Sequence, residues 1–190
     1  MKFYDLDPVP GRACGDCTVC CTVMAIDKAD IQKEAGVTCR HCQGGGCAIY
    51  DSRPQLCRDF HCGWRQLPIL DDGWRPDRSG VFVEIEAVDG ETVLSLVLTG
   101  NPLKTIRQPW FVDFVMTGAA GGVALHLGIP GPKGFQGASL PITTRQMFEA
   151  ANTSHARVKA LLEKELKRLT AHVFEPRLFV HSGADMGAKA

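Results

Sequence analysis

Residues 14–21 read CGDCTVCC, residues 39–42 read CRHC, and single cysteines follow at Cys47, Cys57 and Cys62. All nine cysteines of the 190-residue chain lie in this stretch, which ends near Trp64. Thiolates are soft ligands that bind zinc ions and iron–sulfur clusters. We therefore predict a zinc site or an iron–sulfur cluster here, with the rest of the chain as its scaffold. The candidate ligands are Cys14, Cys17, Cys20, Cys21, Cys39, Cys42, Cys47, Cys57 and Cys62.

Disulfide bonds are the main alternative use for so many cysteines, since small secreted domains are often rich in them. Residues 1–8, however, contain no apolar run of the kind found in a signal peptide. Nine is an odd number and would leave one thiol unpaired, and a chain of this length can bury a core without cross-links. These points favour reduced cysteines and predict a cytoplasmic location.

The composition is that of an ordinary globular protein. Lys and Arg together number 21, as do Asp and Glu, so the formal net charge is zero. A neutral chain has no general electrostatic attraction to nucleic acid or acidic lipid, and no apolar run reaches the length that spans a bilayer. We expect the chain to bind a metal ion or cluster, and to bind neither nucleic acid nor membranes. The sequence does not identify a protein partner.

The rest of the pattern predicts an α+β fold. It would consist of an irregular Cys-rich metal-binding module packed on a small, mainly antiparallel sheet with a long C-terminal helix. Residues 1–70 would form the zinc- or iron-chelating module and residues 71–190 the scaffold. Inside the module we expect a short strand over 22–26, a helix from Asp27 to Gly36, and a second helix that Ser52 caps.

Three segments of the scaffold have clear patterns. Alternating side chains on both sides of Asp89-Gly90 predict a hairpin over 81–99. A third strand is expected over 123–127, and the segment from 128 to 141 is rich in Gly and Pro and predicts a loop. An apolar stripe with 3.6-residue spacing predicts a helix over about 143–173, with Thr143 as its N-cap.

The cysteine spacing does not identify the metal. Cys14-x-x-Cys17-x-x-Cys20 is similar to a ferredoxin cluster loop, and the same CxxC pairs are typical of zinc knuckles. Cys20 and Cys21 are neighbours, and neighbouring side chains of an extended chain point to opposite sides. On that basis they would serve different centres, or one would be spare.

Other polar side chains lie among the cysteines. His61 follows Cys57 by four residues and would share its helix face, so it is a possible ligand or a neighbour of the ligands. Five arginines would either neutralise the negative charge of a thiolate site or serve solubility alone. They are Arg12, Arg40, Arg53, Arg58 and Arg65.

Three motifs in this stretch resemble the bacterial CxxCxxCC family of zinc- or iron-chelating domains. They are Cys14-x-x-Cys17-x-x-Cys20-Cys21, Gly46-Cys47-Ala48-Ile49-Tyr50 and Arg53-Pro54-x-x-Cys57-Arg58-x-Phe60. The match covers roughly residues 14–64. The resemblance implies metal chelation, with either zinc or iron. Cys39, Cys42 and Cys62 resemble a subgroup pattern, and residues 80–190 contain no motif of a known family.

The cysteine module also resembles that of flagellin lysine N-methylase, which raises the alternative of an enzyme related to protein lysine N-methylation. The glycines of 118–122 precede a predicted strand, which is the wrong order for a cofactor-binding loop, and they favour a turn. No catalytic constellation stands out, so the residues favour a binding protein over an enzyme. A zinc-type nucleic-acid-binding module is the third reading, and the neutral charge disfavours it.

Overall fold

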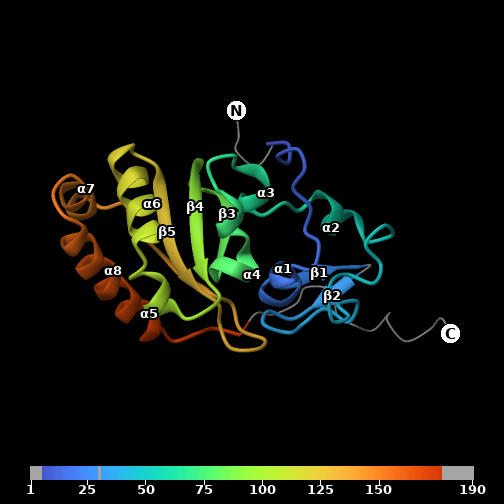
Figure 1. Ribbon diagram of the computed structural model, residues 1–190. Coiled ribbons are helices and arrows are strands. Elements are labelled where there is room, and N and C mark those ends of the chain that lie inside the picture. The colour runs from blue at the N-terminus through green and yellow to red at the C-terminus, as the bar shows by residue number, and fades with distance from the viewer. Residues whose placement is uncertain (1–5, 30, 177–190) are drawn as a thin grey trace.

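The computed structural model describes residues 6–29 and 31–176. It contains helices and two separate sheets, which confirms the predicted α+β class. Figure 1 shows two regions side by side, a cysteine-rich region in blue to teal and a larger layered region in green to red. The first carries all nine cysteines, and the second holds the larger sheet.

The larger sheet has four strands in the order β3-β4-β5-β6, with bounds Val81–Val88, Glu91–Leu98, Ala124–Ile129 and Ala138–Pro141. β3 and β4 form the predicted hairpin, and its turn residues Asp89 and Gly90 have φ values of 50° and 84°. Two successive positive φ values suit the twist of a tight hairpin. β5 pairs parallel with β4, and β6 pairs antiparallel with β5. Antiparallel pairing therefore predominates, as predicted.

β6 replaces the end of the loop predicted over 128–141. Its four residues are too few to show an alternating pattern among the surrounding Gly and Pro residues. β6 lies at the edge of the sheet, where Pro141 is tolerated because an edge position needs no hydrogen bond on its outer side.

The crossover between the parallel strands β4 and β5 consists of α5 (Pro102–Thr105) and α6 (Pro109–Ala120). Both helices begin with proline, which suits the first helical turn because the missing amide would have no partner there. The glycines after α6 form a turn, as expected, and Gly122 has a φ of 72°.

The long C-terminal helix is in fact two helices, α7 (Arg145–Ala151) and α8 (His155–Thr170). The prediction of one helix over 143–173 is wrong at residues 152–154. Ser154 is extended, with φ −164° and ψ 125°. The Thr153 hydroxyl donates to the carbonyl of Glu149 at 3.0 Å. Such short polar side chains compete with helical hydrogen bonds and end the helix.

The N-cap of α7 is one residue later than predicted. Thr144 accepts a hydrogen bond from the amide of Met147 at 3.2 Å and is the cap. Thr143 instead bonds to the neighbouring strand: its hydroxyl accepts from the Leu125 amide at 2.7 Å and donates to the Val123 carbonyl at 2.9 Å. Two adjacent threonines gave the sequence two possible caps.

The cysteine-rich region contains three short helices and a small hairpin. They are α1 (Val19–Val23), β1 (Ile26–Lys28), β2 (Ile31–Lys33), α2 (Gln55–Asp59) and α3 (Gly63–Gln66). A strand over 22–26 and a helix from Asp27 are therefore wrong, because the helix comes first and the hairpin second. The side chain of Asp27 accepts a hydrogen bond from Gln32 across the hairpin at 3.1 Å instead of capping a helix.

Two short helices lead into the larger sheet, η2 (Asp72–Trp74) and α4 (Pro76–Ser79). Gly63 at the start of α3 lies so close to β3 that an added Cβ would be 2.5 Å from Val83 Cγ1. The rings of Phe60 and Phe82 are also in contact, with centroids 6.0 Å apart. These contacts join the segment that carries the last cysteines to the scaffold.

Arg12 fixes the turn that follows α3. Its guanidinium donates to the carbonyls of Trp64, Leu67 and Leu70 and lies over the Trp64 ring. These three side chains are buried and belong to the core of the scaffold. The last residues of the predicted 1–70 module thus pack with the scaffold.

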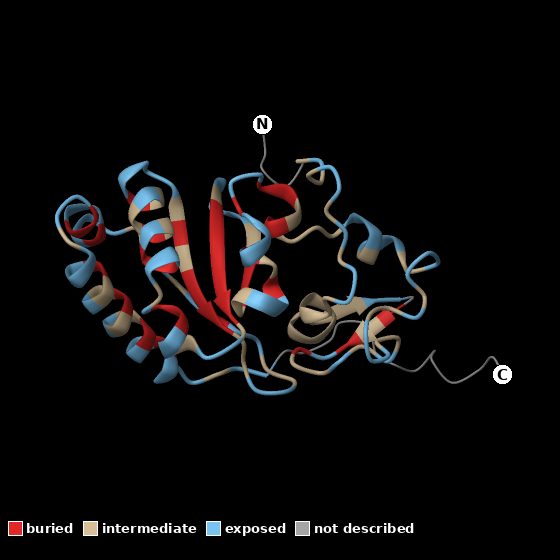
Figure 2. Ribbon diagram, in the orientation of Figure 1, coloured by how far each residue is buried: buried red, intermediate tan, exposed pale blue. Residues whose placement is uncertain are grey.

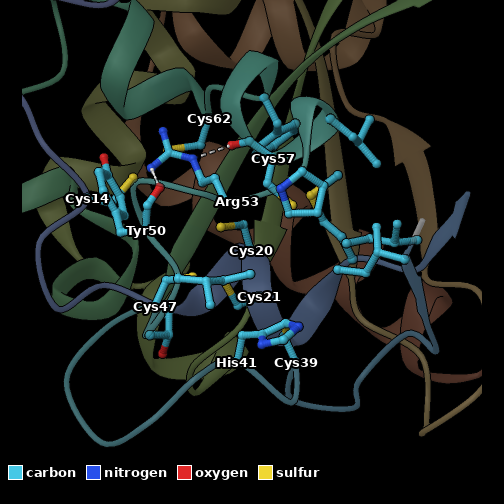
Figure 3. Close-up of a pocket in the computed structure, with 18 of the residues that line it drawn as sticks. Cys14, Cys20, Cys21, Cys39, His41, Cys47, Tyr50, Arg53, Cys57 and Cys62 are labelled. Carbon is cyan, nitrogen blue, oxygen red and sulfur yellow. Dashed lines mark hydrogen bonds between the residues drawn. The ribbon is translucent and has the colours of Figure 1, made fainter. Parts of the chain in front are cut away.

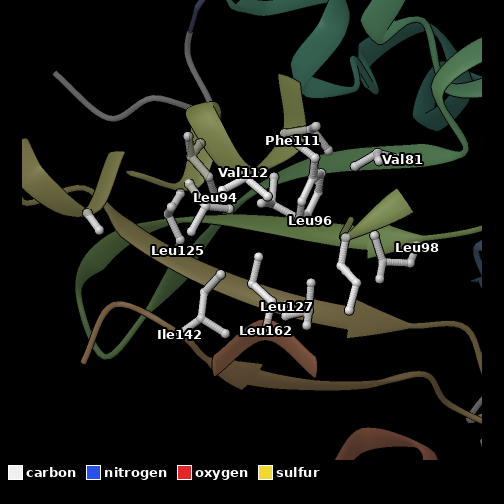
Figure 4. Packing of buried hydrophobic residues seen from close by; sticks show 14 of the residues in the cluster. Val81, Leu94, Leu96, Leu98, Phe111, Val112, Leu125, Leu127, Ile142 and Leu162 are labelled. Atoms are coloured by element: carbon white, nitrogen blue, oxygen red, sulfur yellow. The ribbon is translucent and has the colours of Figure 1, made fainter. Parts of the chain in front are cut away.

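The core lies between the larger sheet and its helices (Figure 4). Leu96, Phe111, Leu127 and Leu162 come from β4, α6, β5 and α8, and each is fully buried. In Figure 2 buried residues are concentrated in this region, whereas the cysteine-rich region is mostly intermediate or exposed. Among the described residues no helix has both the length and the apolar composition of a membrane span.

Candidate metal centre

Eight of the nine cysteines line one cavity of ≈ 350 Å³ in the cysteine-rich region (Figure 3). The ninth, Cys42, forms a β-bridge with Cys47, and its thiol contacts Cys21. All nine are free thiols. The structure thus brings the predicted ligands to one place. The cysteines that line the cavity are Cys14, Cys17, Cys20, Cys21, Cys39, Cys47, Cys57 and Cys62.

Cys20 and Cys21 both line the cavity because they lie on α1. Successive side chains of a helix differ by about 100° in direction, from 3.6 residues per turn, so two neighbours can face the same space. Their thiols are hydrogen bonded to each other. The expectation that they point to opposite sides assumed an extended chain, and that assumption is wrong.

Cys39, Cys42 and Cys47 are held beside Cys21 by the backbone. The Cys39 amide donates to the Cys21 carbonyl at 2.9 Å, and the Cys42 amide donates to the Cys39 carbonyl at 2.9 Å. The bridge between Cys42 and Cys47 closes this loop. Glycines 44–46 between them all have positive φ, which allows the chain to reverse over so few residues.

α2 carries Cys57 to the cavity, as predicted, but Ser52 does not cap it; Pro54 holds the N-cap position. Arg53 fixes this segment instead. Its Nε donates to the Cys57 carbonyl and its Nη1 to the Tyr50 carbonyl, both at 3.1 Å. The guanidinium also lies 3.8 Å from the centre of the Tyr50 ring.

Cys14, Cys17 and Cys62 lie in another part of the cavity. The Cys17 amide donates to the Cys14 carbonyl at 3.0 Å, which forms a tight turn. Arg65 connects this turn to Cys62: its Nη1 lies 3.9 Å from Cys14 Sγ, and its backbone amide donates to the Cys62 carbonyl at 2.8 Å. His61 lies beyond the end of α2 and contacts Arg65, so it does not share a helix face with Cys57.

An ion-pair network anchors the first cysteine turn to the scaffold. Arg75 binds Asp16 in that turn and also binds Asp77 of α4, with N–O distances of 2.6 and 2.7 Å to the latter. The hydrogen bond from Arg75 lowers the pKa of Asp77, and the hydrogen bond with the Cys17 thiol lowers it further. The Asp77 carboxylate is therefore both ionised and in contact with a candidate ligand.

The predicted arginines have different roles. In the described part of the chain, Arg65 is the one of the five that donates to a sulfur. Arg40 contacts His41, and Arg12, Arg53 and Arg58 donate to backbone carbonyls. The Nε of Arg65 is buried and has no hydrogen-bond partner. A positive group with a free donor beside Cys14 favours a negatively charged occupant at this place.

Lys33 is a second cation beside the cysteines. It is only 7% exposed, and its ammonium donates to the carbonyls of Thr22, Glu34 and Val37 at 2.8–3.0 Å. Burial lowers the pKa of Lys33, and nearby cysteines offset only part of this shift. Those cysteines are Cys20, Cys21, Cys39 and Cys42. A lysine held among four thiols is suited to compensate thiolate charge.

Burial keeps several of these thiols protonated. It raises the pKa of Cys42 to about 12 and that of Cys62 to about 11, and it also raises the pKa of Cys17 and Cys57. Thiols that act as nucleophiles have a lowered pKa. These cysteines therefore lack the activation of a nucleophile, whereas a bound metal ion would replace their protons.

Within residues 6–29 and 31–176 no three His, Cys, Asp or Glu side chains are already placed as a metal site requires. Coordination would have to draw thiols of the cavity together, as is common where metal binding and folding are coupled. The donor set nevertheless fits a soft metal: nine free thiols, a buried lysine and an arginine with a free buried donor.

Three residues near the thiols had no assigned role in the sequence. His41 lines the cavity between Cys39 and Cys42, and its place in the CRHC motif was a local signal. Lys33 and Asp77 match no cysteine spacing in the sequence, so only the fold reveals that they lie near the thiols. The comparisons with known proteins identify no relative: no family model matches the chain, and neither do any curated protein or solved structure at a significant level.

Proposed function

We propose that this chain binds zinc or an iron–sulfur cluster through its cysteine thiolates and has a structural or electron-transfer role. The observation that carries the proposal is the meeting of eight free thiols around one cavity, with Cys42 bridged to one of them and two cations nearby. Soft thiolate donors bind both kinds of centre. The cations would reduce the negative charge that several thiolates leave around a metal.

The likeness to the CxxCxxCC family supports the same proposal from the sequence. Its three motifs, at residues 14–21, 46–50 and 53–60, are separate in the chain, yet residues from each line the cavity. A chelating role accounts for that convergence, because ligands must surround one centre. The expected cytoplasmic location belongs to this proposal, since a reducing compartment keeps thiols free.

Anaerobic purification followed by metal analysis and absorption spectroscopy tests the proposal. We expect at least one metal ion per chain, with a visible sulfur-to-iron band for a cluster or a colourless protein for zinc. Replacing the exposed His155, which pairs with Asp113 far from the cavity, should leave the metal content unchanged. A folded protein that contains no metal and joins these cysteines in disulfides would refute it.

A further inference from the structure

We propose that the nine thiols form two separate centres. A six-thiol group would hold two or more metal atoms, and a three-thiol group would hold one. The proposal rests on the function proposed above and specifies how that site is divided. The six-thiol group is Cys20, Cys21, Cys39, Cys42, Cys47 and Cys57, and the three-thiol group is Cys14, Cys17 and Cys62.

The six-thiol group is connected by direct contacts. Cys20 and Cys21 are neighbours on α1, and both line the cavity. Backbone hydrogen bonds link Cys21 to Cys39 and Cys39 to Cys42, and the β-bridge adds Cys47. The Tyr50 amide donates to the Cys47 carbonyl at 3.1 Å, and Arg53 donates to the carbonyls of both Tyr50 and Cys57, so Cys57 is connected to the same group.

The three-thiol group has its own contacts. The Cys14–Cys17 turn and Cys62 are joined through Arg65, which contacts the sulfur of Cys14 and the backbone of Cys62. In Figure 3 Cys14 and Cys62 lie in the upper part of the view, Cys57 lies beside them toward the centre, and Cys21, Cys39 and Cys47 lie in the lower part.

Each group also has its own cation. Lys33 donates to the carbonyls of Thr22, next to Cys21, and of Val37, two residues before Cys39, and Arg65 donates to Cys14 of the three-thiol group. Two cations, each beside a different set of thiols, fit two negatively charged centres.

The number of donors sets what each centre can hold. One tetrahedral ion uses about four thiolates, so six are too many for one ion and too few for two unless sulfurs are shared. Cys20 and Cys21, neighbours on α1 that both line the cavity, are where sharing would occur. Three thiolates need a fourth ligand, and the Asp77 carboxylate is held close to the Cys14–Cys17 turn because Arg75 binds both Asp77 and Asp16. That set suits one divalent ion such as zinc.

Stepwise metal loading of the wild-type chain tests the division without any substitution. The metal-free, reduced protein is titrated with zinc chloride, treated with an alkylating reagent at each step, and analysed by peptide mass spectrometry. We expect the members of the three-thiol group to become protected together, at a different loading from the other six. Parallel protection of all nine thiols at every step would overturn the division and leave the proposed function intact.

Paired variants give a second readout. Cys14→Ser/Cys62→Ser should lose about one ion per chain, the content of a three-thiolate site, and keep the absorption spectrum of the larger centre after cobalt substitution. Cys21→Ser/Cys42→Ser should lose that spectrum and keep about one ion per chain. Loss of all metal in either variant while its circular dichroism stays native would overturn the division. A wild-type chain that takes up neither zinc, cobalt nor iron would overturn the proposed function, and the division with it.

Discussion

At the scale of single residues, Lys33 is the side chain on which the thiol site depends most. Its ammonium donates to three backbone carbonyls, those of Thr22, Glu34 and Val37. These bonds connect the segment after Cys21, the hairpin and the segment before Cys39. The ammonium places a positive charge among the thiols and satisfies three buried carbonyls. A buried group with both functions cannot be replaced without loss.

Lys33→Met keeps the length of the side chain and removes its charge. We expect metal affinity to fall by about 10–100-fold, the usual effect of losing a group that supports metal ligands. Competition titration with a zinc-binding dye measures this change. Lys104→Met on α5, where the lysine is exposed and does not line the cavity, is the control and should bind metal as the wild type does. Equal affinities for the two variants would contradict a role for the Lys33 charge.

Glu84 on β3 provides a test by pH. Burial raises its pKa from 4.5 to about 7, and the neighbouring Glu86 contributes. The folded state therefore holds a proton that the unfolded state releases near pH 4.5, so this group lowers stability as the pH rises from 4.5 to 7. At pH 8 the free energy of unfolding of Glu84→Gln should be about 1–3 kcal/mol higher than that of the wild type, since one pKa unit corresponds to about 1.4 kcal/mol. At pH 4.5 the difference should be small.

Denaturant unfolding at both pH values measures the effect of Glu84→Gln. Glu91→Gln, at an exposed position of β4, is the control and should change stability little at either pH. A gain for Glu84→Gln that is the same at pH 4.5 and pH 8 would show that ionisation of this carboxyl is not the cause.

At the scale of elements, α3 packs against the scaffold and thereby fixes the position of Cys62. Gly63 follows that cysteine directly, and its missing Cβ allows α3 to lie against Val83. Gly63→Ala should cost about 1–3 kcal/mol of stability, the usual range for overpacking a core contact, and should weaken metal binding because Cys62 must move.

Thermal unfolding and metal titration of Gly63→Ala, Val83→Ala and the double variant form a cycle that isolates this contact. In the double variant the smaller Val83→Ala side chain leaves space for the new methyl group. We expect it to bind metal better than Gly63→Ala alone. If the effects of Gly63→Ala and Val83→Ala on metal affinity are additive in the double variant, the close approach of α3 to β3 does not position Cys62.

The elements that the sequence predicts well are those with long periodic patterns. The hairpin 81–99 and the α8 part of the C-terminal helix have many apolar positions each, so their type is clear from spacing. The cysteine-rich region has no such pattern. Its order of helix then hairpin depends on contacts such as the Lys33 ammonium with three carbonyls, which link positions that no local spacing relates.

The candidate site, too, was predictable from the sequence only in part. Clustering of nine cysteines was enough to predict that the candidate ligands lie together, and eight of them line one cavity. The grouping was not predictable, because it depends on α1 turning Cys20 and Cys21 to the same side and on Arg65 joining Cys14 to Cys62. Both facts follow from tertiary packing. Asp77 and Lys33 are likewise neighbours of thiols only in the folded chain.

At the scale of the whole molecule, the two regions depend on different sources of stability. The sheet region buries large apolar side chains such as Leu96 and Phe111 completely, which the hydrophobic effect stabilises. In the cysteine-rich region α1 and α2 bury no residue, and the few buried side chains include the charged Lys33. Metal coordination would supply the missing free energy there.

Metal removal should therefore loosen residues 14–62 before the rest of the chain. Amide hydrogen exchange with and without a chelator should show lost protection for this segment, while β4 and β5 keep theirs. Leu96→Ala is the complementary variant: it should destabilise the sheet by about 2–5 kcal/mol, as expected for a buried leucine, with metal content unchanged below the unfolding temperature. Loss of protection that is equal in both regions on chelation would show that the chain unfolds as one cooperative unit.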